Sequence, residues 1–323
     1  MRYGLPYQGS KNQIAKWLID QLPPAETFVD LFFGGGAVTH VALLSGKYKR
    51  FIVNDIDGRL PKLFLECAYG KHTTDTHPEW ISREEFHRRK ETDAYVALVW
   101  SFGNNGKGYI YGEDVEEYKH AYHQAVFNGD LKPFENLGIK LSCSTEKAIY
   151  DRYADCKRQL QRLYGANGKD GNEQLERLQS FERLQSFERL QSFERLQSLQ
   201  SLQSLQSLQS LQSDYSEVEI PKDAVIYCDP PYEGTNCGKY DGFDSGRFHE
   251  WARRQDNIFI SEYSMPDDFI VVAETEKVIL SAANGNSQKA TERLYTNQRT
   301  YSTMSETQRN IIKFNTAEQL SLF

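Results

Sequence analysis

The chain has 323 residues, 39% of them apolar and 13% aromatic, which is enough to bury a core and to form two globular parts. Its formal net charge of -7 argues against a protein that coats nucleic acid through bulk positive charge, although a basic cleft can lie within an acidic chain. The five cysteines are scattered without a C-x-x-C pair, so we expect reduced thiols and no zinc site. Because no stretch approaches the ~20 apolar residues that span a bilayer, and the N-terminus has no apolar signal region, the sequence favours a cytoplasmic protein.

The first part of the chain alternates helix and strand in the way that a parallel sheet requires. In chain order, the pattern predicts a helix capped by Ser10 and stopped by Pro23, a buried strand at 27–31, a glycine turn at 34–36, an apolar helix at 38–46 and a strand at 51–53. These elements form a β-α-β unit.

The pattern changes near residue 80 to amphipathic helices that carry many charges and tyrosines. Ser82 and Glu85 fit a capping box at the start of the first of these helices. Residues 103–108 are too rich in glycine to be anything but a loop. We therefore expect a separate, mostly helical domain over residues 80–174.

Residues 175–213 are a low-complexity repeat, with three copies of Phe-Glu-Arg-Leu-Gln-Ser followed by five copies of Leu-Gln-Ser. A period of three advances about 300° per repeat in an α-helix of ~3.6 residues per turn, so the leucines of an α-helix would occupy no fixed face. We expect an exposed helical or disordered insert, and near-identical units suggest expansion of a repeated coding tract.

The sheet pattern resumes after the repeat. It predicts a strand at 224–228, a helix at 248–255 and strands at 257–260, 269–273 and 277–280. The expected plan is thus one α/β domain made of residues 1–79 and 214–315, interrupted by the helical domain and the repeat and followed by a tail at 316–323.

The first motif is Asp30-Leu31-Phe32-Phe33-Gly34-Gly35-Gly36, followed by Asp55 at the end of the second strand. Glycines directly after a strand let the backbone approach a ligand closely, and a carboxylate at the tip of the next strand can hold ribose hydroxyls. Thr39 stands where a dinucleotide fingerprint has its third glycine, which favours a nucleoside without phosphates. A tight turn that binds nothing is the structural alternative.

The second motif is Asp229-Pro230-Pro231-Tyr232, immediately after a buried strand. Two prolines fix the backbone and donate no N–H, so the loop is rigid and its carbonyl groups are free to accept hydrogen bonds from a ligand. An aspartate, free carbonyls and an aromatic ring at a strand's end can clamp a planar amine. The alternative is a proline-terminated strand with a solvent-exposed tyrosine.

With both motifs in this order, the sequence resembles the Dam-type, alpha-class adenine-N6 DNA methyltransferases, including phage and prophage members. The resemblance covers residues 7–57 and 225–294, with a weaker echo at 100–112. It implies a Rossmann-like methyltransferase sheet with an inserted, mostly helical target-recognition domain, S-adenosylmethionine as methyl donor, no metal, double-stranded DNA as substrate and, for a restriction-modification enzyme, a cognate restriction endonuclease as partner.

Carried over position by position, the resemblance assigns two sets of site residues. The catalytic set is Asp229, Pro230, Pro231 and Tyr232. The cofactor-binding set is Tyr7, Lys11, Asp30, Phe32, Gly34, Gly36, Asp55 and Asp229. Tyr7 stands where the family is expected to have tryptophan, and Glu292-Arg293-Leu294-Tyr295 resembles the late strand of the fold only weakly.

The chemistry that the resemblance implies needs no metal. The adenine amino lone pair is delocalised into the ring, so hydrogen bonds to Asp229 and to the Pro230 carbonyl would draw the nitrogen toward tetrahedral geometry. Tyr232 would stack on the base, and positioning against an already activated methyl group would supply much of the acceleration. The base would have to be flipped out of the duplex.

The helical domain would supply the DNA contacts. The candidates form three groups, which are Arg83, Arg88, Arg89 and Lys90, then the Lys107 loop, and then Lys147, Arg152, Lys157, Arg158 and Arg162. Each of them has a solvated surface charge as its alternative. The tyrosines at 109, 111, 118 and 122 are expected in the core and not on a base-stacking surface.

Two classes of alternative remain open from sequence. One is methylation of another planar amine, such as cytosine N4, an RNA adenine or a protein amide. The other is a catalytically silent DNA-binding protein whose repeat mediates association. The intact Asp55 and Asp229 loop favour the enzyme over the silent protein.

Overall fold

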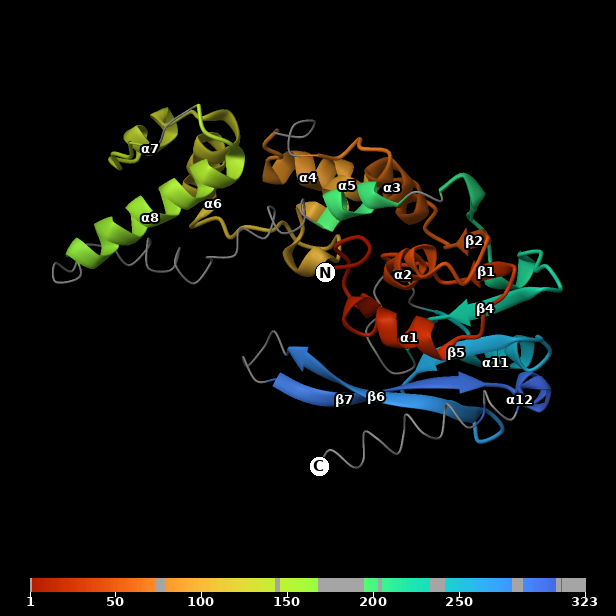
Figure 1. Cartoon of the computed structure of the whole chain (residues 1–323). Coiled ribbons are helices and arrows are strands. Elements are labelled where there is room, and N and C mark those ends of the chain that lie inside the picture. The colour runs from red at the N-terminus through yellow and green to blue at the C-terminus, as the bar shows by residue number, and fades with distance from the viewer. Residues whose placement is uncertain are drawn as a thin grey trace. The chain divides into compact units, whose positions relative to one another are not determined.

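The computed structural model describes residues 2–73, 79–142, 146–167, 195–202, 205–232, 242–280, 287–305 and 309 (Figure 1). Residues 175–194 of the repeat and the expected tail at 316–323 lie outside these ranges. The chain divides into two compact units. Unit 1 comprises Met1–Leu5, Gly9–Ala68 and Ser198–Phe323, and unit 2 comprises Pro6–Gln8 and Tyr69–Gln197.

Unit 1 is built on a sheet in which the described residues form seven strands, in the order β3-β2-β1-β4-β5-β7-β6. The strands are β1 (Thr27–Asp30), β2 (Arg50–Asn54), β3 (Leu208–Leu211), β4 (Ala224–Cys228), β5 (Ile258–Glu262), β6 (Ile270–Leu280) and β7 (Ser287–Thr296). β1 to β5 pair in parallel, and β7 runs antiparallel to both β5 and β6. This mixed, mostly parallel sheet confirms the predicted α/β class.

Several helices of unit 1 begin at a residue whose side chain caps the first turn. The helices are α1 (Ala15–Gln21), α2 (Ala37–Ser45), α3 (Arg59–Ala68), α11 (Ser245–Ala252) and α12 (Gln298–Thr303), with the short helical turns η1 (Lys11–Gln13), η4 (Leu199–Ser201), η5 (Leu205–Ser207) and η6 (Tyr215–Glu217). Asp244 caps α11, and Asn297 caps α12. Ser10 caps η1, which precedes α1, by accepting a hydrogen bond from the Asn12 amide at 3.3 Å. Glycines in the left-handed region, at φ 66° and 68°, bound α2 at Gly36 and Gly46.

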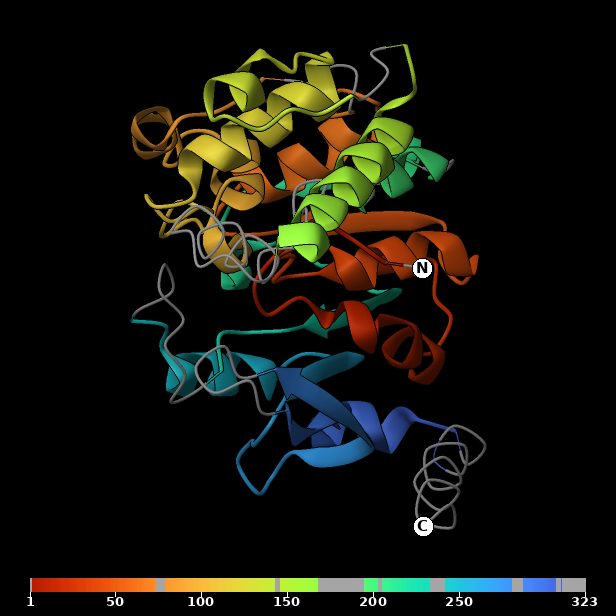
Figure 2. The same ribbon diagram turned by 90° about the vertical axis from the view of Figure 1, so that its left-hand side faces the viewer.

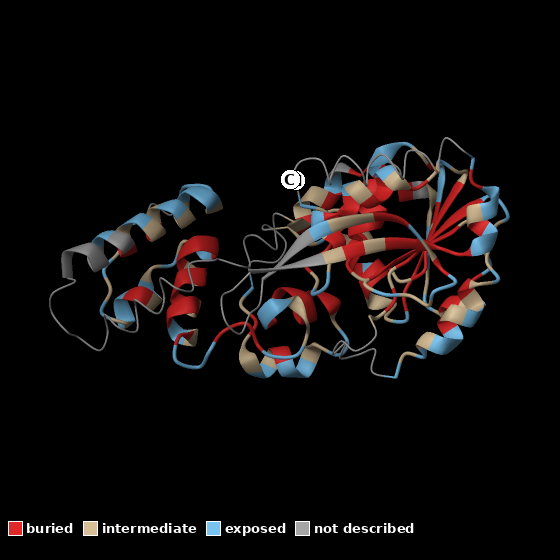
Figure 3. Cartoon of the chain, turned by 90° about the horizontal axis from the view of Figure 1, so that it is seen from below, coloured by how far each residue is buried: buried red, intermediate tan, exposed pale blue. Residues whose placement is uncertain are grey.

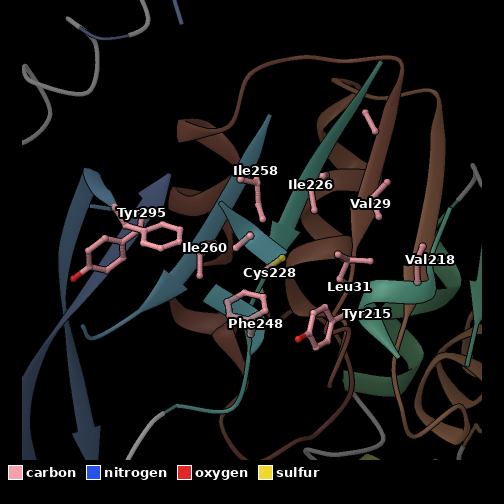
Figure 4. Packing of buried hydrophobic residues seen from close by; sticks show 13 residues of the cluster. Val29, Leu31, Tyr215, Val218, Ile226, Cys228, Phe248, Ile258, Ile260 and Tyr295 are labelled. Carbon is pink, nitrogen blue, oxygen red and sulfur yellow. The ribbon is translucent and has the colours of Figure 1, made fainter. Parts of the chain in front are cut away.

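The core of unit 1 lies beside the parallel strands (Figures 3 and 4). Val29, Ile226 and Ile258 occupy neighbouring positions on β1, β4 and β5, and all three are buried. Phe248 of α11 and Tyr215 of η6 pack their rings edge to face at 5.4 Å against this surface. Strands buried in this way have continuous apolar sequences, which is why 224–228 is predictable as a strand.

Unit 2 is helical in its described part (Figure 2). Its elements are α4 (Arg83–Arg89), α5 (Ala94–Val99), η2 (Phe102–Asn104), α6 (Glu116–His123), the π-helical turn η3 (Gln124–Asn128), α7 (Lys132–Asn136) and α8 (Ile149–Asn167). The Ser82 hydroxyl accepts a hydrogen bond from the Glu85 amide at 3.2 Å, which confirms the predicted cap. The four tyrosines at 109, 111, 118 and 122 are buried, as expected of core residues.

The sequence predicts two strands at 269–273 and 277–280, and this prediction is wrong. The structure has one strand, β6, which pairs with β7 from Ile270 to Leu280 and carries an irregularity between Val271 and Ala273. Glu274 and Glu276 interrupt the apolar pattern of this segment. A strand at the edge of a sheet can hold charged side chains on its open face, so the interruption in hydrophobicity does not end the strand.

The expected helical character of the repeat is confirmed at residues 195–201, but the expected exposure is wrong for its described leucines. Leu199, Leu202 and Leu205 are buried, and the following unit forms the edge strand β3, in which Leu208 pairs with Phe51 and Leu211 with Asn54. Leu199 and Leu205 begin separate 3₁₀ turns, Leu202 is extended, and Leu208 begins β3, so the described part of the repeat follows no single helix. The parallel partner β2 supplies the pairing that local periodicity does not show.

Deleting Leu199-Gln200-Ser201 is expected to leave both the fold and the activity intact. Every position from 202 to 213 keeps its residue, and Leu196 can take the place of Leu199 because the sequence repeats every three residues. We expect the melting temperature to change by less than about 3 °C. By contrast, Leu199→Ala leaves a cavity at a fully buried position and should cost about 2–4 kcal/mol. Thermal unfolding of both variants tests this, and a deletion variant that does not fold contradicts it.

The cysteines at 67, 156 and 228 are buried free thiols, while those at 143 and 237 lie outside the described residues. Among the described residues, no helix is both long enough and apolar enough to cross a membrane.

Candidate active site

The glycine turn after β1 is held against the end of β2. The Gly34 amide donates a hydrogen bond to Asp55 Oδ2 at 2.7 Å, and the Phe33 amide donates to the Asn54 carbonyl at 2.9 Å. Asp55 Oδ1 accepts a second bond from the Asp57 amide at 2.9 Å. Asp55 is buried, at 4% exposure, and fixes the glycine turn to the end of β2.

Two glycines of the turn adopt backbone conformations that other residues avoid. Gly34 has φ 50° and Gly36 has φ 66°. A Cβ on Gly36 would lie 2.3 Å from the Phe33 ring, which leaves no room for a side chain. Phe32 points into the core, where it packs edge to face on Phe248 at 5.6 Å. The turn is therefore a rigid cradle formed mainly by backbone.

Asp30 lies beneath this turn and is only 1% exposed. Its Oδ2 accepts a hydrogen bond from the Thr39 hydroxyl at 2.7 Å. Burial raises the pKa of Asp30 from 3.8 to about 7, opposed by the Thr39 hydrogen bond and assisted by the charges of Asp229 and Asp55. Thr39, which stands at the position of the missing third glycine, therefore binds a buried carboxyl group of the fold.

Asp30→Asn is expected to make the protein less sensitive to rising pH. Between pH 5 and 6 the Asp30 carboxyl is protonated in the folded protein and ionised in the unfolded chain, because its pKa is raised only in the fold. The free energy of unfolding of the wild type therefore falls by about 1.4 kcal/mol as the pH rises by one unit. The asparagine variant lacks this contribution. Denaturant unfolding at pH 5 and pH 6 should therefore show a stability difference, variant minus wild type, that grows by this amount. Parallel pH dependences in the two proteins would refute the raised pKa.

Asp229 follows β4 at the same edge of the sheet as the turn, since β1 and β4 are parallel neighbours. Its carboxylate is 21% exposed and lies 2.9 Å from the Lys11 ammonium. Pro230 is buried and Pro231 half-buried. The loop therefore presents one partly exposed carboxylate on a rigid backbone, next to a strand that ends at the glycine turn.

Tyr232 turns its ring toward Lys11. The ammonium lies 4.3 Å from the ring centroid, and the phenol oxygen accepts a hydrogen bond from it. The Tyr263 ring packs edge to face on Tyr232 at 4.6 Å. Burial raises the pKa of Tyr232 well above its usual value, so the phenol remains a neutral hydrogen-bond donor.

Glu292 of β7 lies in one cluster with Lys11, Asp229 and Tyr232, although the sequence analysis assigned it no role. It is fully buried and lies 3.1 Å from Lys11. The Ser261 hydroxyl donates to its Oε1 at 2.8 Å, and the Tyr232 hydroxyl donates to the same oxygen. The available signal is the two-residue period of a strand, because Glu292 shares the buried face with Leu294. A glutamate at such a buried position requires an ionic or hydrogen-bonding partner.

Lys11 is consequently a member of the Asp229 group. Burial opposes its ionisation, but the charges of Asp229 and Glu292 outweigh burial and raise its pKa above the usual value. Tyr7, in contrast, falls in unit 2, where the adjacent Gln8 amide donates to the Asn104 carbonyl at 3.3 Å. The structure therefore brings Lys11 together with the catalytic candidates and assigns Tyr7 to the other unit.

Glu262, at the end of β5, is a further buried acid beside this group and is 6% exposed. Burial raises its pKa to about 8, opposed by a hydrogen bond from the Tyr263 amide and assisted by the charge of Asp229. It accepts that amide hydrogen bond at 2.8 Å. Burial thus favours the protonated form of Glu262.

The candidate DNA-binding residues lie in unit 2 and make local ion pairs. Arg83 pairs with Glu116 at 2.9 Å, and Arg89 pairs with Glu85 at 2.9 Å and with Asp93 at 2.7 Å. Arg88 and Arg158 are the more exposed, at 74% and 63% of the side chain, and pair with Glu85 and Asp155. Lys107 is exposed, and its carbonyl accepts a hydrogen bond from the Lys90 ammonium at 2.9 Å.

No group of three or more histidine, cysteine, aspartate or glutamate side chains that could hold a metal ion occurs among the described residues. The carboxylates at the strand ends accept hydrogen bonds from backbone amides at Asp55 and pair with the Lys11 ammonium at Asp229.

Residues 7–126 match the family of D12 class N6 adenine-specific DNA methyltransferases. This range includes the glycine turn, Asp55 and the first helices of unit 2, and it ends before β4. The Asp229 loop lies outside the matched range. No curated protein matches the chain.

Proposed function

We propose that the chain, in which residues 7–126 match the D12 class of N6 adenine-specific DNA methyltransferases, transfers a methyl group from S-adenosylmethionine to adenine N6 in duplex DNA at the Asp229 loop. The observation that carries this proposal is the convergence of two features at one sheet edge. A partly exposed carboxylate follows β4, and the Asp55-bound glycine turn follows the neighbouring strand β1.

S-adenosylmethionine supplies a methyl group already activated by a sulfonium charge. Asp55 would accept hydrogen bonds from the ribose hydroxyls, and the backbone of Gly34 to Gly36 would pack against the nucleoside. Thr39 stands where a dinucleotide fingerprint has its third glycine, and its hydroxyl donates a hydrogen bond to Asp30 inside the fold. The turn therefore lacks the third glycine of a pyrophosphate-binding fingerprint. The donor set thus fits a nucleoside without phosphates.

Asp229 would accept a hydrogen bond from the adenine amine, and the Pro230 carbonyl would accept the second. Together they would rotate the nitrogen lone pair out of conjugation and aim it at the methyl group. Tyr232, whose ring is fixed by its hydroxyl, would contact the base. As the new N–C bond forms, the S–CH₃ bond of the sulfonium would break and its electron pair would stay on sulfur, leaving S-adenosylhomocysteine. The methylated amine would then lose one proton, which Asp229 would accept on its way to solvent.

Adenine N6 takes part in base pairing inside a duplex, so the target nucleotide would be flipped out at a cost of about a few kcal/mol. We propose that unit 2 supplies phosphate contacts through Arg88, Arg158 and the Lys107 loop. In a restriction-modification system, an endonuclease of the same recognition sequence would be the functional partner.

The substrate class is tested by offering methyl-labelled S-adenosylmethionine with unmethylated duplex DNA, the same DNA as single strands, RNA or a protein mixture. We expect label in the duplex at a rate at least about tenfold above the other polymers, because the flipped base is read within a duplex. Faster labelling of RNA or protein would contradict the proposal. Bound cofactor without any transfer would favour a silent binding protein.

A further inference from the structure

Two carboxylates of unit 1 share the Lys11 ammonium, and they differ in access to solvent. Asp229 lies 2.9 Å from Lys11 with 21% of its side chain exposed, and Glu292 lies 3.1 Å from Lys11 with none exposed. Lys11 itself is 5% exposed. A ligand can therefore reach Asp229 but not Glu292.

The contact between Lys11 and Asp229 competes with the proposed role of Asp229. An ammonium donates a strong, charge-assisted hydrogen bond to a carboxylate and weakens its ability to accept another. The adenine amine needs that acceptor. Lys11 cannot simply leave, because a buried charge without a partner is costly.

Glu292 resolves this competition. It already bonds the ammonium and also accepts hydrogen bonds from the Ser261 and Tyr232 hydroxyls. These contacts come from β5 and from the Asp229 loop, so Glu292 is fixed on two sides. An anion held in this way can keep the ammonium when Asp229 turns to another donor.

We infer that Glu292 is a positioning residue which retains Lys11 and Tyr232 while Asp229 engages the target amine. This inference rests on the proposed function. It assigns to Glu292 an effect on the transfer step and no contact with substrate or cofactor.

The test compares four proteins in single-turnover methyl transfer at saturating cofactor and duplex DNA. These are wild type, Glu292→Gln, the double variant Glu292→Gln with Lys11→Met, and Glu274→Gln. Glu274 of β6 is the matched control. It lies opposite Arg293, the residue after Glu292 on β7, and forms a partly exposed ion pair with Arg293 at 3.4 Å. Glu292→Asp is added as the conservative variant.

Glu292→Gln is expected to lower the transfer rate on the order of 30-fold while cofactor affinity changes by less than about threefold. Without Glu292, the ammonium stays on Asp229. Removing that ammonium as well should therefore restore the rate at least about fivefold over the single variant. Glu292→Asp should lose less than the glutamine variant, and Glu274→Gln should match wild type.

Several results would overturn the inference. One is a transfer rate in Glu292→Gln equal to that of wild type. Another is a loss of cofactor affinity in Glu292→Gln as large as its loss of transfer rate. The third is a double variant that transfers methyl more slowly than Glu292→Gln. If Glu292→Gln does not fold, the aspartate variant decides, because a wild-type rate there shows that the geometry of Glu292 is irrelevant. Wild-type protein that methylates no adenine refutes the proposed function itself, and the inference falls with it.

Discussion

Replacing Asp229 with alanine is expected to lower the single-turnover rate of methyl transfer by about 10³-fold or more. The side chain is the partly exposed acceptor of the loop, and the two prolines after it carry no N–H that could substitute. The fold should persist, because Lys11 keeps Glu292 as a partner at 3.1 Å. Cofactor affinity should fall by less than about tenfold, because Asp55 remains in place.

The matched control for this variant is Asp223→Ala. Asp223 precedes the same strand β4 at its opposite end, where it pairs with Arg50 at 3.2 Å and is about half exposed. Rapid-quench measurement of labelled DNA gives both rates. A variant at 229 that still transfers methyl within tenfold of wild type would show that another group accepts the amine.

Replacing Asp55 with alanine is expected to raise the dissociation constant of S-adenosylmethionine by about 100-fold or more, equivalent to ~2.8 kcal/mol. Two effects add. The variant loses the proposed ribose acceptor, and it releases the Gly34 amide that Asp55 Oδ2 holds at 2.7 Å. Asp55→Asn should fall between alanine and wild type, since one acceptor oxygen remains.

Calorimetric titration with S-adenosylmethionine measures this effect directly. Glu26→Ala is the control, because Glu26 precedes β1 at the far end of the strands and pairs with the exposed Lys49 at 3.0 Å. Wild-type affinity in the Asp55 variant would remove this carboxylate from the cofactor site. Equal weakening in the Glu26 variant would indicate a general loss of stability.

The parts of the fold that sequence reasoning predicts well are those in which local patterns agree with burial. Residues 224–228 are apolar throughout and form β4 as predicted, because a strand covered on both faces has no polar alternation. Gly36 marks the start of α2 because few other residues adopt φ 66°. The helix cap at Ser82 is predictable because it needs only a local hydrogen bond from the Glu85 amide to the Ser82 hydroxyl.

The parts that sequence reasoning misses depend on tertiary partners. The repeat supplies β3 because β2 offers an edge for parallel pairing. β6 continues through Glu274 and Glu276 because β7 pairs with it along its length. Both features depend on a partner strand and therefore do not follow from local sequence periodicity.

The candidate site shows the same division. Asp55 and Asp229 are recognisable from their positions after apolar strands, and parallel pairing brings those strand ends to one edge. Lys11 and Glu292 are 281 positions apart in sequence numbering and meet at 3.1 Å. Local spacing cannot predict that contact, although a glutamate on the buried face of a strand indicates that a cation lies nearby.

The most direct test of the central claim is the chemical identity of the methylated nucleoside. Wild-type protein is incubated with deuteromethyl-labelled S-adenosylmethionine and enzymatically amplified, unmethylated genomic DNA, which offers many recognition sequences at once. The DNA is then digested and its nucleosides are separated by mass. We expect the label in N6-methyldeoxyadenosine. Label in N4-methyldeoxycytidine instead, or in no nucleoside while the cofactor is bound, would contradict it.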